Sequence, residues 1–140
     1  MADLWSDAEL GEMISDGVVL SFEAATAITK GDLVYLSVDM KVSKCSATTQ
    51  YAIGVALKTV AVGEFASVCV RGVVKVTFGA AVSRGAVVQA DANARAITVA
   101  DGSGTYTPAE IPDRIARAVG ICLTAASASG DTGLIYVDKA

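Results

Sequence analysis

The feature that most constrains this fold is a series of short β-prone runs separated by glycine-containing turns. From Val18 onward, these runs are rich in Val, Ile and Thr, which favour strands. Lys30-Gly31-Asp32 and Arg84-Gly85 are typical turn signals between them. Many short strands at this spacing are typical of an all-β barrel or sandwich. We predict strands at residues 18–23, 33–37, 51–57, 66–70, 73–78, 87–90, 96–99, 116–124 and 134–138.

An internal repeat is the strongest long-range signal in the sequence. Residues 27–34 (AITKGDLV) match residues 81–88 (AVSRGAVV) at an offset of 54. Residues 53–57 (IGVAL) match 119–123 (VGICL) at an offset of 66, and 68–70 (VCV) match 135–137 (IYV) at an offset of 67. We therefore predict two repeated strand–turn–strand units, at residues 25–70 and 79–137, with an insertion at 100–114 in the second.

The repeat indicates one β-domain over residues 18–140, built from two duplicated units that share a core. Gly54 and Gly120 occupy matched places inside apolar runs, which is typical of a bulge or a close approach of two backbones. The nearly continuous apolar runs favour burial on both faces, one of them against another subunit. The pattern leaves a small barrel, a sandwich and a more open tulip-like arrangement as alternatives.

Residues 1–17 are expected to form an acidic, extended N-terminal arm. Residues 1–23 carry six acidic side chains and no basic one, whereas residues 24–140 carry the other nine acids and all eleven bases, a net charge of +2. Asp7 is a candidate N-cap for a short helix that ends at Met13 or Ile14, and a frayed terminus is the alternative. Trp5, beside Leu4, suits either docking on a partner or folding back onto the domain.

The sequence offers no convincing catalytic chemistry and no metal or cofactor site. It contains no histidine, which is the commonest general base and metal ligand. Ser83 lies in a motif one residue short of a nucleophile elbow, and the segment from Asp91 to Asn93 lacks the spacing of a calcium loop. The acidic residues Glu64, Asp101, Glu110 and Asp131 all fall in predicted turns. We therefore expect a protein that is not an enzyme.

Charge, hydropathy and cysteine spacing narrow the classes of partner. The near-neutral body lacks the basic cluster that nucleic-acid binding requires, so no nucleic-acid partner is expected. The longest uncharged stretches have 13 residues, too few for a membrane-spanning helix, and the N-terminus lacks the pattern of a signal peptide. Cys45, Cys69 and Cys122 are far apart and odd in number, which favours buried, reduced thiols and an intracellular site of synthesis.

Four segments carry a resemblance to a known family. They are residues 27–36 (AITKGDLVYL), 51–57 (YAIGVAL), 68–76 (VCVRGVVKV) and 118–123 (AVGICL). Together they resemble the small capsid-decoration, or cement, proteins of tailed phages, over roughly residues 24–137. The resemblance rests on glycines and small apolar residues, and the acidic arm and the insertion at 100–114 depart from a minimal member.

The resemblance implies an all-β protein that binds the outside of the mature capsid, contacts the major capsid protein and reinforces the shell as a homotrimer. The resemblance therefore implies synthesis in the host cytoplasm and a final location on the outer surface of the virion, and the family offers no catalytic residues to carry over. We expect Leu4, Trp5 and Leu10 of the arm to contact the capsid. The leading alternative is a head-surface module that binds host glycans or a receptor. An unrecognised enzyme and a cellular β-domain are weaker alternatives.

Overall fold

The computed structural model describes residues 8–99 and 115–139, and it is almost entirely β-sheet. Nine strands form one continuous sheet in the order β1-β3-β2-β4-β5-β9-β8-β6-β7. The strands are β1 (Val18–Ala24), β2 (Leu33–Val38), β3 (Lys41–Lys44), β4 (Ala52–Ala56), β5 (Phe65–Thr77), β6 (Val87–Ala90), β7 (Ala96–Thr98), β8 (Gly120–Cys122) and β9 (Thr132–Asp138). The predicted all-β class is confirmed.

The first five strands close into a small barrel. Strand β1 pairs with β3 at one edge and with β5 at the other, so the sheet β1-β3-β2-β4-β5 has no free end. The pairing of β1 with β5 is antiparallel, with Leu20 opposite Val68. We call this unit the first barrel. Of the barrel, the sandwich and the tulip-like arrangement left open by the sequence, the structure contains the closed barrel.

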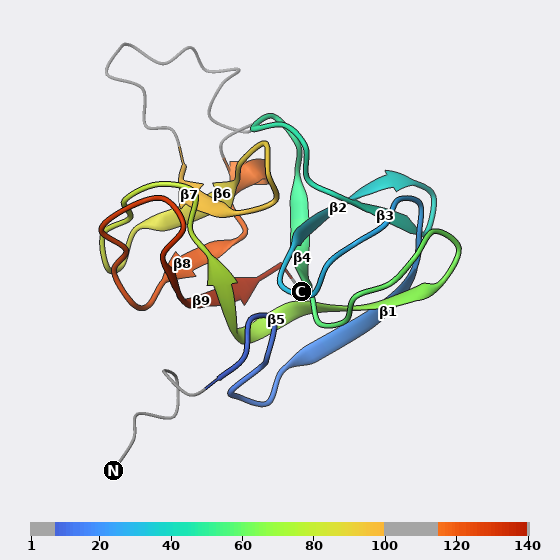
Figure 1. The fold of residues 1–140 in the computed structure, drawn as a ribbon, viewed down its shortest axis with the longest axis horizontal. Coiled ribbons are helices and arrows are strands. Elements are labelled where there is room, and N and C mark those ends of the chain that lie inside the picture. The colour runs from blue at the N-terminus through green and yellow to red at the C-terminus, as the bar shows by residue number, and fades with distance from the viewer. Residues whose placement is uncertain (1–7, 100–114, 140) are drawn as a thin grey trace.

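The C-terminal half of β5 begins a second rolled sheet. It pairs with β9, and the order continues through β8 and β6 to β7. The two edges of this sheet meet at one parallel bridge between Phe78 and Ala96. We call this unit the second barrel. Figure 1 shows the two barrels side by side, with β5 running from one into the other.

Strand β5 is continuous where the sequence predicted two strands with a break near Arg71 and Gly72. Arg71 pairs with Val18 of β1 and also with Asp138 of β9, so its backbone is held by neighbours from both barrels. Gly72 has no side chain to crowd the junction and pairs with Val137. One 13-residue strand therefore serves as a wall of both barrels.

Residues matched by the sequence repeat make the same backbone contacts in the two barrels. The Gly31 N–H donates to the Ala56 carbonyl at 2.8 Å, and the Gly85 N–H donates to the Cys122 carbonyl at 2.8 Å. Isolated antiparallel bridges join Ile28 to Val60 and Val82 to Ala126. The correspondence extends upstream of residue 25, because the pairing of β1 with β5 has its counterpart in the pairing of β5 with β9.

Each barrel encloses apolar side chains that alternate along its strands with outward-facing ones. In the first barrel, Phe22, Ile28 and Val68 are among the buried residues. Their repeat counterparts in the second barrel are Val76, Val82 and Ile135, which are buried as well. The cluster around the second barrel also includes residues of the first barrel, so the two units pack on one another.

Residues 8–17 lie against β5 and do not form the helix predicted from Asp7. The Gly11 N–H donates to the Lys75 carbonyl at 2.7 Å, and the Ile14 N–H donates to the Val73 carbonyl at 3.0 Å. Met13 forms an antiparallel bridge with Val74. Gly11 has a left-handed backbone with φ of 76°, which is incompatible with a helical turn. The N–H groups of Gly11 and Ile14 bond to β5 and do not bond within a helix. Residues 1–7, including the predicted cap, lie outside the described residues.

Two further strand predictions differ from the structure. Strand β3 has the sequence KVSK, whose single apolar residue gives too weak a pattern to predict a strand, and it forms because β1 and β2 both pair with it. The predicted strand at 116–124 shortens to β8, and residues 115–117 are helical. The predicted insertion at 100–114 lies outside the described residues.

Candidate functional site

The residues with the strongest catalytic patterns serve as parts of turns. Ser83 is exposed, and its carbonyl accepts a hydrogen bond from the Ala86 N–H at 3.0 Å. The Asp91 carboxylate accepts from the N–H groups of Asn93 at 2.8 Å and Arg95 at 2.9 Å, and it also pairs with the Arg95 guanidinium at 3.2 Å. Its oxygens are therefore committed to closing the β6–β7 hairpin.

Two of the candidate acids occupy repeat-related turns and cap them. Glu64 accepts a hydrogen bond from the Ala61 N–H at 2.6 Å. Asp131 accepts from the N–H and the hydroxyl of Ser127 and from the N–H of Ala128, at 2.9 to 3.1 Å. These bonds, led by the one from the Ser127 N–H, hold the pKa of Asp131 below its ordinary value of 3.8. Asp101 and Glu110 lie outside the described residues.

The three cysteines are buried as free thiols. Burial raises the pKa of Cys45 to about 12, with smaller contributions from the negative charges of Asp32 and Asp91. Burial also raises the pKa values of Cys69 and Cys122. All three thiols are therefore held in the protonated form, which is a poor nucleophile.

Neither a metal cluster nor a membrane-spanning helix occurs within residues 8–99 and 115–139. No group of three or more Cys, Asp or Glu side chains in these ranges is placed to hold a metal ion. None of their helical segments has the length and apolar character needed to cross a bilayer. The candidate contact surfaces of the described residues are formed by exposed apolar side chains.

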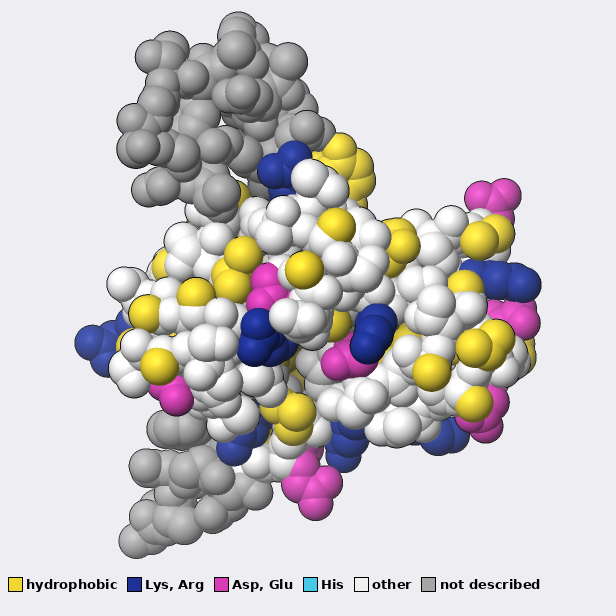
Figure 2. Space-filling model, turned by 45° about the horizontal axis from the view of Figure 1, so that its top comes forward, with side chains coloured by type: hydrophobic (Ala, Val, Ile, Leu, Met, Phe, Trp, Pro, Cys, Tyr) yellow, Lys and Arg dark blue, Asp and Glu magenta, His cyan; other side chains and the backbone are white. Residues whose placement is uncertain are grey.

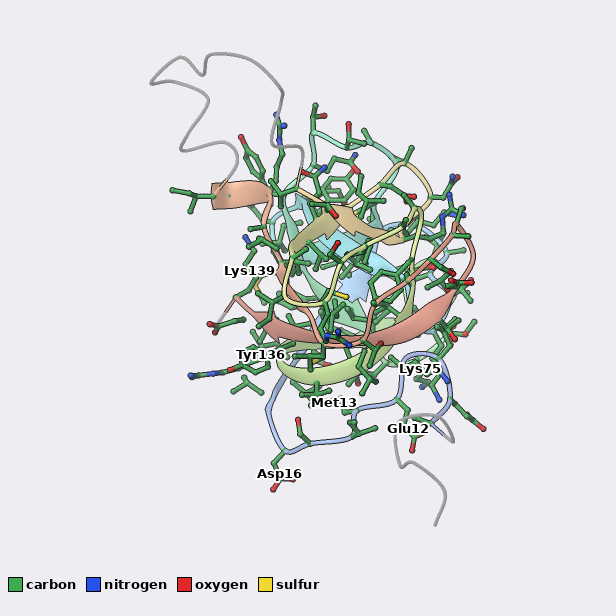
Figure 3. The ribbon with its side chains drawn as sticks, turned by 90° about the vertical axis from the view of Figure 1, so that its left-hand side faces the viewer. Glu12, Met13, Asp16, Lys75, Tyr136 and Lys139 are labelled. Atoms are coloured by element: carbon green, nitrogen blue, oxygen red, sulfur yellow. The ribbon has the colours of Figure 1, made fainter. Side chains whose placement is uncertain are left out.

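The first exposed apolar surface lies on the outside of the second barrel, and we call it the outer face. It consists of Val87 on β6, Ile121 on β8 and Tyr136 on β9, which border a shallow hollow. Val87 is 45% exposed and Ile121 is 39% exposed. Tyr136 and Lys139 both line this hollow and lie on the same side of the molecule (Figure 3).

The second exposed surface lies at one open end of the first barrel, and we call it the mouth. Its members come from four strands and from the β2–β3 turn, and they line two adjoining hollows. The mouth is lined by the exposed Leu20, Leu36 and Met40, the half-buried Ile53 and the buried Val70. Met40 is the most exposed of them, at 68%. Figure 2 shows apolar side chains gathered at the right-hand end of the molecule, which carries the first barrel.

The third surface is the turn between β4 and β5, and we call it the tip. Val62 and Phe65 are 65% and 67% exposed there. Their repeat counterparts in the second barrel are Ser129 and Thr132, which are polar. Because the same turn forms with polar residues, the fold itself does not require apolar side chains at the tip.

The structure places one of the three predicted capsid-contact residues. Leu10 is half-buried, and it packs against the turn at Gly31, where an added Cβ would lie 2.7 Å from Leu10 Cγ. Nearby, Glu9 forms an ion pair with Lys30 at 3.3 Å. Leu4 and Trp5 lie outside the described residues, so their role stays a prediction.

Sequence reasoning did not single out the outer face, the mouth or the tip. The three surfaces consist of ordinary strand and turn residues, and nothing in the local sequence pattern distinguishes an exposed valine from a buried one. The repeat contains a usable signal for the tip, because an apolar residue opposite a polar counterpart marks a difference that the fold does not impose. For the outer face and the mouth, only the packing of the two barrels shows which surfaces are left uncovered.

A family described as phage cement protein matches residues 14–137. Among solved structures, the N base of the head fibre gp8.5 of bacteriophage phi29 is similar over 88% of this chain and 95% of that chain, with a TM-score of 0.57 and 16% sequence identity. At this identity the similarity shows the fold. A search of curated proteins found no match.

Proposed function

This chain belongs to the phage cement protein family, and from that premise we propose that it binds the outer surface of the mature phage head and stabilises the shell. Its partner is the major capsid protein, and its role requires no catalytic residue. The stabilisation follows from mass action, because a ligand that binds only the assembled shell shifts the equilibrium towards that state. The protein thus acts as a structural component of the virion.

The observation that carries the proposal is the apolar character of the tip. Val62 and Phe65 project from a turn whose counterpart, with Ser129 and Thr132, is polar. Exposed Phe is enriched at the centres of protein interfaces, where it supplies a large apolar area. The tip therefore offers a docking surface that only one of the two barrels has, and it fixes which end of the molecule faces the shell.

The N-terminal segment supplies the second proposed contact, through Leu4 and Trp5, with Leu10 as its anchor on the domain. Leu10 packs on Gly31, and residues 11–15 pair with β5, so the segment leaves the domain at a fixed point. An apolar anchor that orders on a partner contributes affinity after the entropy of ordering is subtracted. We further propose a homotrimer, which multiplies weak single contacts through multivalency.

The test is cosedimentation of the protein with expanded heads that lack it. We expect Phe65→Asp and Val62→Asp to reduce binding by at least about tenfold, since each places a charge in an apolar contact. The matched controls are Thr132→Asp and Ser129→Asp at the corresponding turn, which should bind like the original chain. Equal binding by both pairs of variants would refute docking through the tip.

Two further measurements test the capsid contact of the arm and the stabilisation of the shell separately. Removal of residues 1–7 stops short of the hydrogen bonds that hold residues 11–15 to β5, so the domain should stay intact. We expect this truncated protein to bind heads more weakly. Heads saturated with the full chain should survive heating that disrupts bare heads. Heads of unchanged thermal stability would exclude the stabilising role.

A further inference from the structure

The contact between the two barrels within one chain provides a template for a second contact. On the first barrel, Leu33, Val55 and Cys69 point outward and are completely buried. They belong to the same apolar cluster as Val74 and Ala94 of the second barrel. The Leu33 N–H donates to the Ala94 carbonyl at 3.0 Å, across the junction. The outside of the first barrel thus covers the open end of the second.

The surface equivalent to this buried one is the outer face of the second barrel. At the repeat offsets, Leu33 corresponds to Val87, Val55 to Ile121, and Cys69 to Tyr136. The strand pairs agree, because Val55 lies opposite Cys69 and Ile121 lies opposite Tyr136. Val87 and Ile121 are exposed where their counterparts are buried. The outer face therefore matches the surface by which the first barrel packs on the second, but no described residue packs against it.

The complementary surface on the first barrel is uncovered at Leu20, Leu36 and Met40. Buried residues at the open end of the second barrel have apolar counterparts in the mouth. The pairs are Val74 with Leu20, Ala90 with Leu36, Ala94 with Met40, Val119 with Ile53, and Val137 with Val70. Leu20 is 45% exposed, whereas Val74 is fully buried. The mouth is therefore the same receiving surface in its uncovered form.

The mouth and the open end of the second barrel also share a backbone conformation, at the residue whose carbonyl accepts the junction hydrogen bond in the second barrel. Met40 and Ala94 have φ values of 58° and 60°. This left-handed conformation is unfavourable for side chains other than glycine, and both hairpins adopt it at the same position. In the second barrel it presents the Ala94 carbonyl to Leu33. By this equivalence, the Met40 carbonyl of the first barrel is the acceptor expected to meet Val87 of another copy.

We propose that the outer face of one copy of this chain docks on the mouth of a second copy, repeating between chains the contact that joins the two barrels within a chain. The occupant of each surface is thus another copy, since each copy carries both halves of the contact. Each surface is also bordered by one acid and one base, Asp39 and Lys139 at the mouth and Asp138 and the same Lys139 at the outer face, so charge does not oppose docking.

Such a contact is heterologous, because it joins two different surfaces of identical chains. Heterologous contacts build a closed ring when the rotation between neighbours closes, and an open chain otherwise. Three copies in a ring would place six barrels in alternating, nearly equivalent positions. The inference does not depend on capsid binding. It supplies the contact that would join the copies of the proposed trimer.

The test measures assembly of the purified full chain by native mass spectrometry and sedimentation. Met40→Asp alters the mouth, and aspartate tolerates the left-handed backbone there. Ile121→Asp alters the outer face at a residue that is already partly exposed. We expect each variant to raise the concentration needed for assembly by at least about 100-fold, because an unpaired charge is buried in the contact. Val62→Asp at the tip is the matched control and should assemble like the original chain.

Mixing the two variants identifies the contact directly. Met40→Asp retains an intact outer face, and Ile121→Asp retains an intact mouth, so the mixture should form a dimer with one copy of each. Circular dichroism of each variant should match that of the original chain, which excludes unfolding as the cause. A monomeric original chain, assembly of either variant at the original concentration, or a mixture that stays monomeric would each overturn the inference. Loss of head binding by Val62→Asp with intact assembly would separate this contact from the capsid contact.

Discussion

Met40 and Ala94 stand 54 positions apart and share a left-handed backbone, which no other described residue besides glycines adopts. Ala94 is buried at the junction of the barrels, and Met40 is exposed at the mouth of the first barrel. Left-handed backbone costs about 1 kcal/mol for an ordinary L-residue. The two hairpins therefore share one turn conformation in different surroundings.

The two positions should respond oppositely to asparagine, which tolerates left-handed backbone. Met40→Asn should leave the free energy of unfolding unchanged or raise it by up to about 1 kcal/mol. Ala94→Asn should lower it by about 2 kcal/mol, because an amide is forced into a filled apolar junction. Denaturant unfolding at a concentration where both variants are monomeric measures the difference. Equal losses would contradict the assigned surroundings.

Gly54 and Gly120 should not tolerate alanine. An added Cβ would overlap the Cys69 carbonyl oxygen at Gly54 and the Tyr136 carbonyl oxygen at Gly120. We expect each substitution to lower the free energy of unfolding by about 3 kcal/mol or more, since backbone on the neighbouring strand must move. The control is Gly85→Ala, where φ is 87° and the space is open, with an expected loss of about 1 kcal/mol. Chemical denaturation of the three variants tests this order.

The thiols should be unreactive in the folded protein. Cys45, Cys69 and Cys122 are buried, and the pKa of Cys45 is raised to about 12 by burial, so thiolate is scarce at neutral and mildly alkaline pH. A thiol-reactive dye should label the native chain slowly and should label all three sites after unfolding in denaturant. Rapid labelling of one native thiol would show that its site opens.

Asp131 should contribute stability near neutral pH and lose that contribution in acid. Its pKa is lowered by hydrogen bonds from Ser127 and Ala128, so the carboxylate form is favoured in the folded state. The contribution is present above the ordinary value of 3.8 and disappears as pH falls through the lower folded pKa. Asp131→Asn should therefore lower the melting temperature near neutrality, and the gap should narrow in acid. A gap that is constant with pH would exclude an ionic origin.

Removing residues 1–15 should destabilise the second barrel. This deletion eliminates the hydrogen bonds that Gly11, Glu12 and Ile14 make with the backbone of Lys75 and Val73. It also uncovers part of the edge of β5, which favours aggregation through strand pairing. We expect a loss of about 2 kcal/mol in the free energy of unfolding, from about 1 kcal/mol or less per hydrogen bond together with the lost packing of Met13. Removal of residues 1–7 alone is the control, and equal stability of the two truncated proteins would contradict the pairing.

The accuracy of sequence interpretation in this chain followed the strength of the local pattern. Strand β6 lies where the alternation and the preceding Arg84-Gly85 turn predict it. Strand β3 was missed because pairing with β1 and β2, and not its own composition, makes KVSK a strand. The helix predicted from Asp7 was wrong because residues 11–15 find hydrogen-bond partners on β5, at a distance in sequence that no local pattern encodes.

Residue patterns alone were enough to predict the all-β class, the turns at Lys30-Gly31-Asp32 and Arg84-Gly85, and the repeat offsets of 54, 66 and 67. These predictions follow from β-branched side chains, from glycine at turns and from repeated residue order. Which of two matching surfaces is covered became known from the packing of the two barrels. Leu33 is buried and Val87 is exposed, although each begins the matching strand of its barrel, β2 and β6. Burial depends on what packs against a surface. Among residues 8–99 and 115–139, the first barrel has a neighbour on that side and the outer face of the second has none.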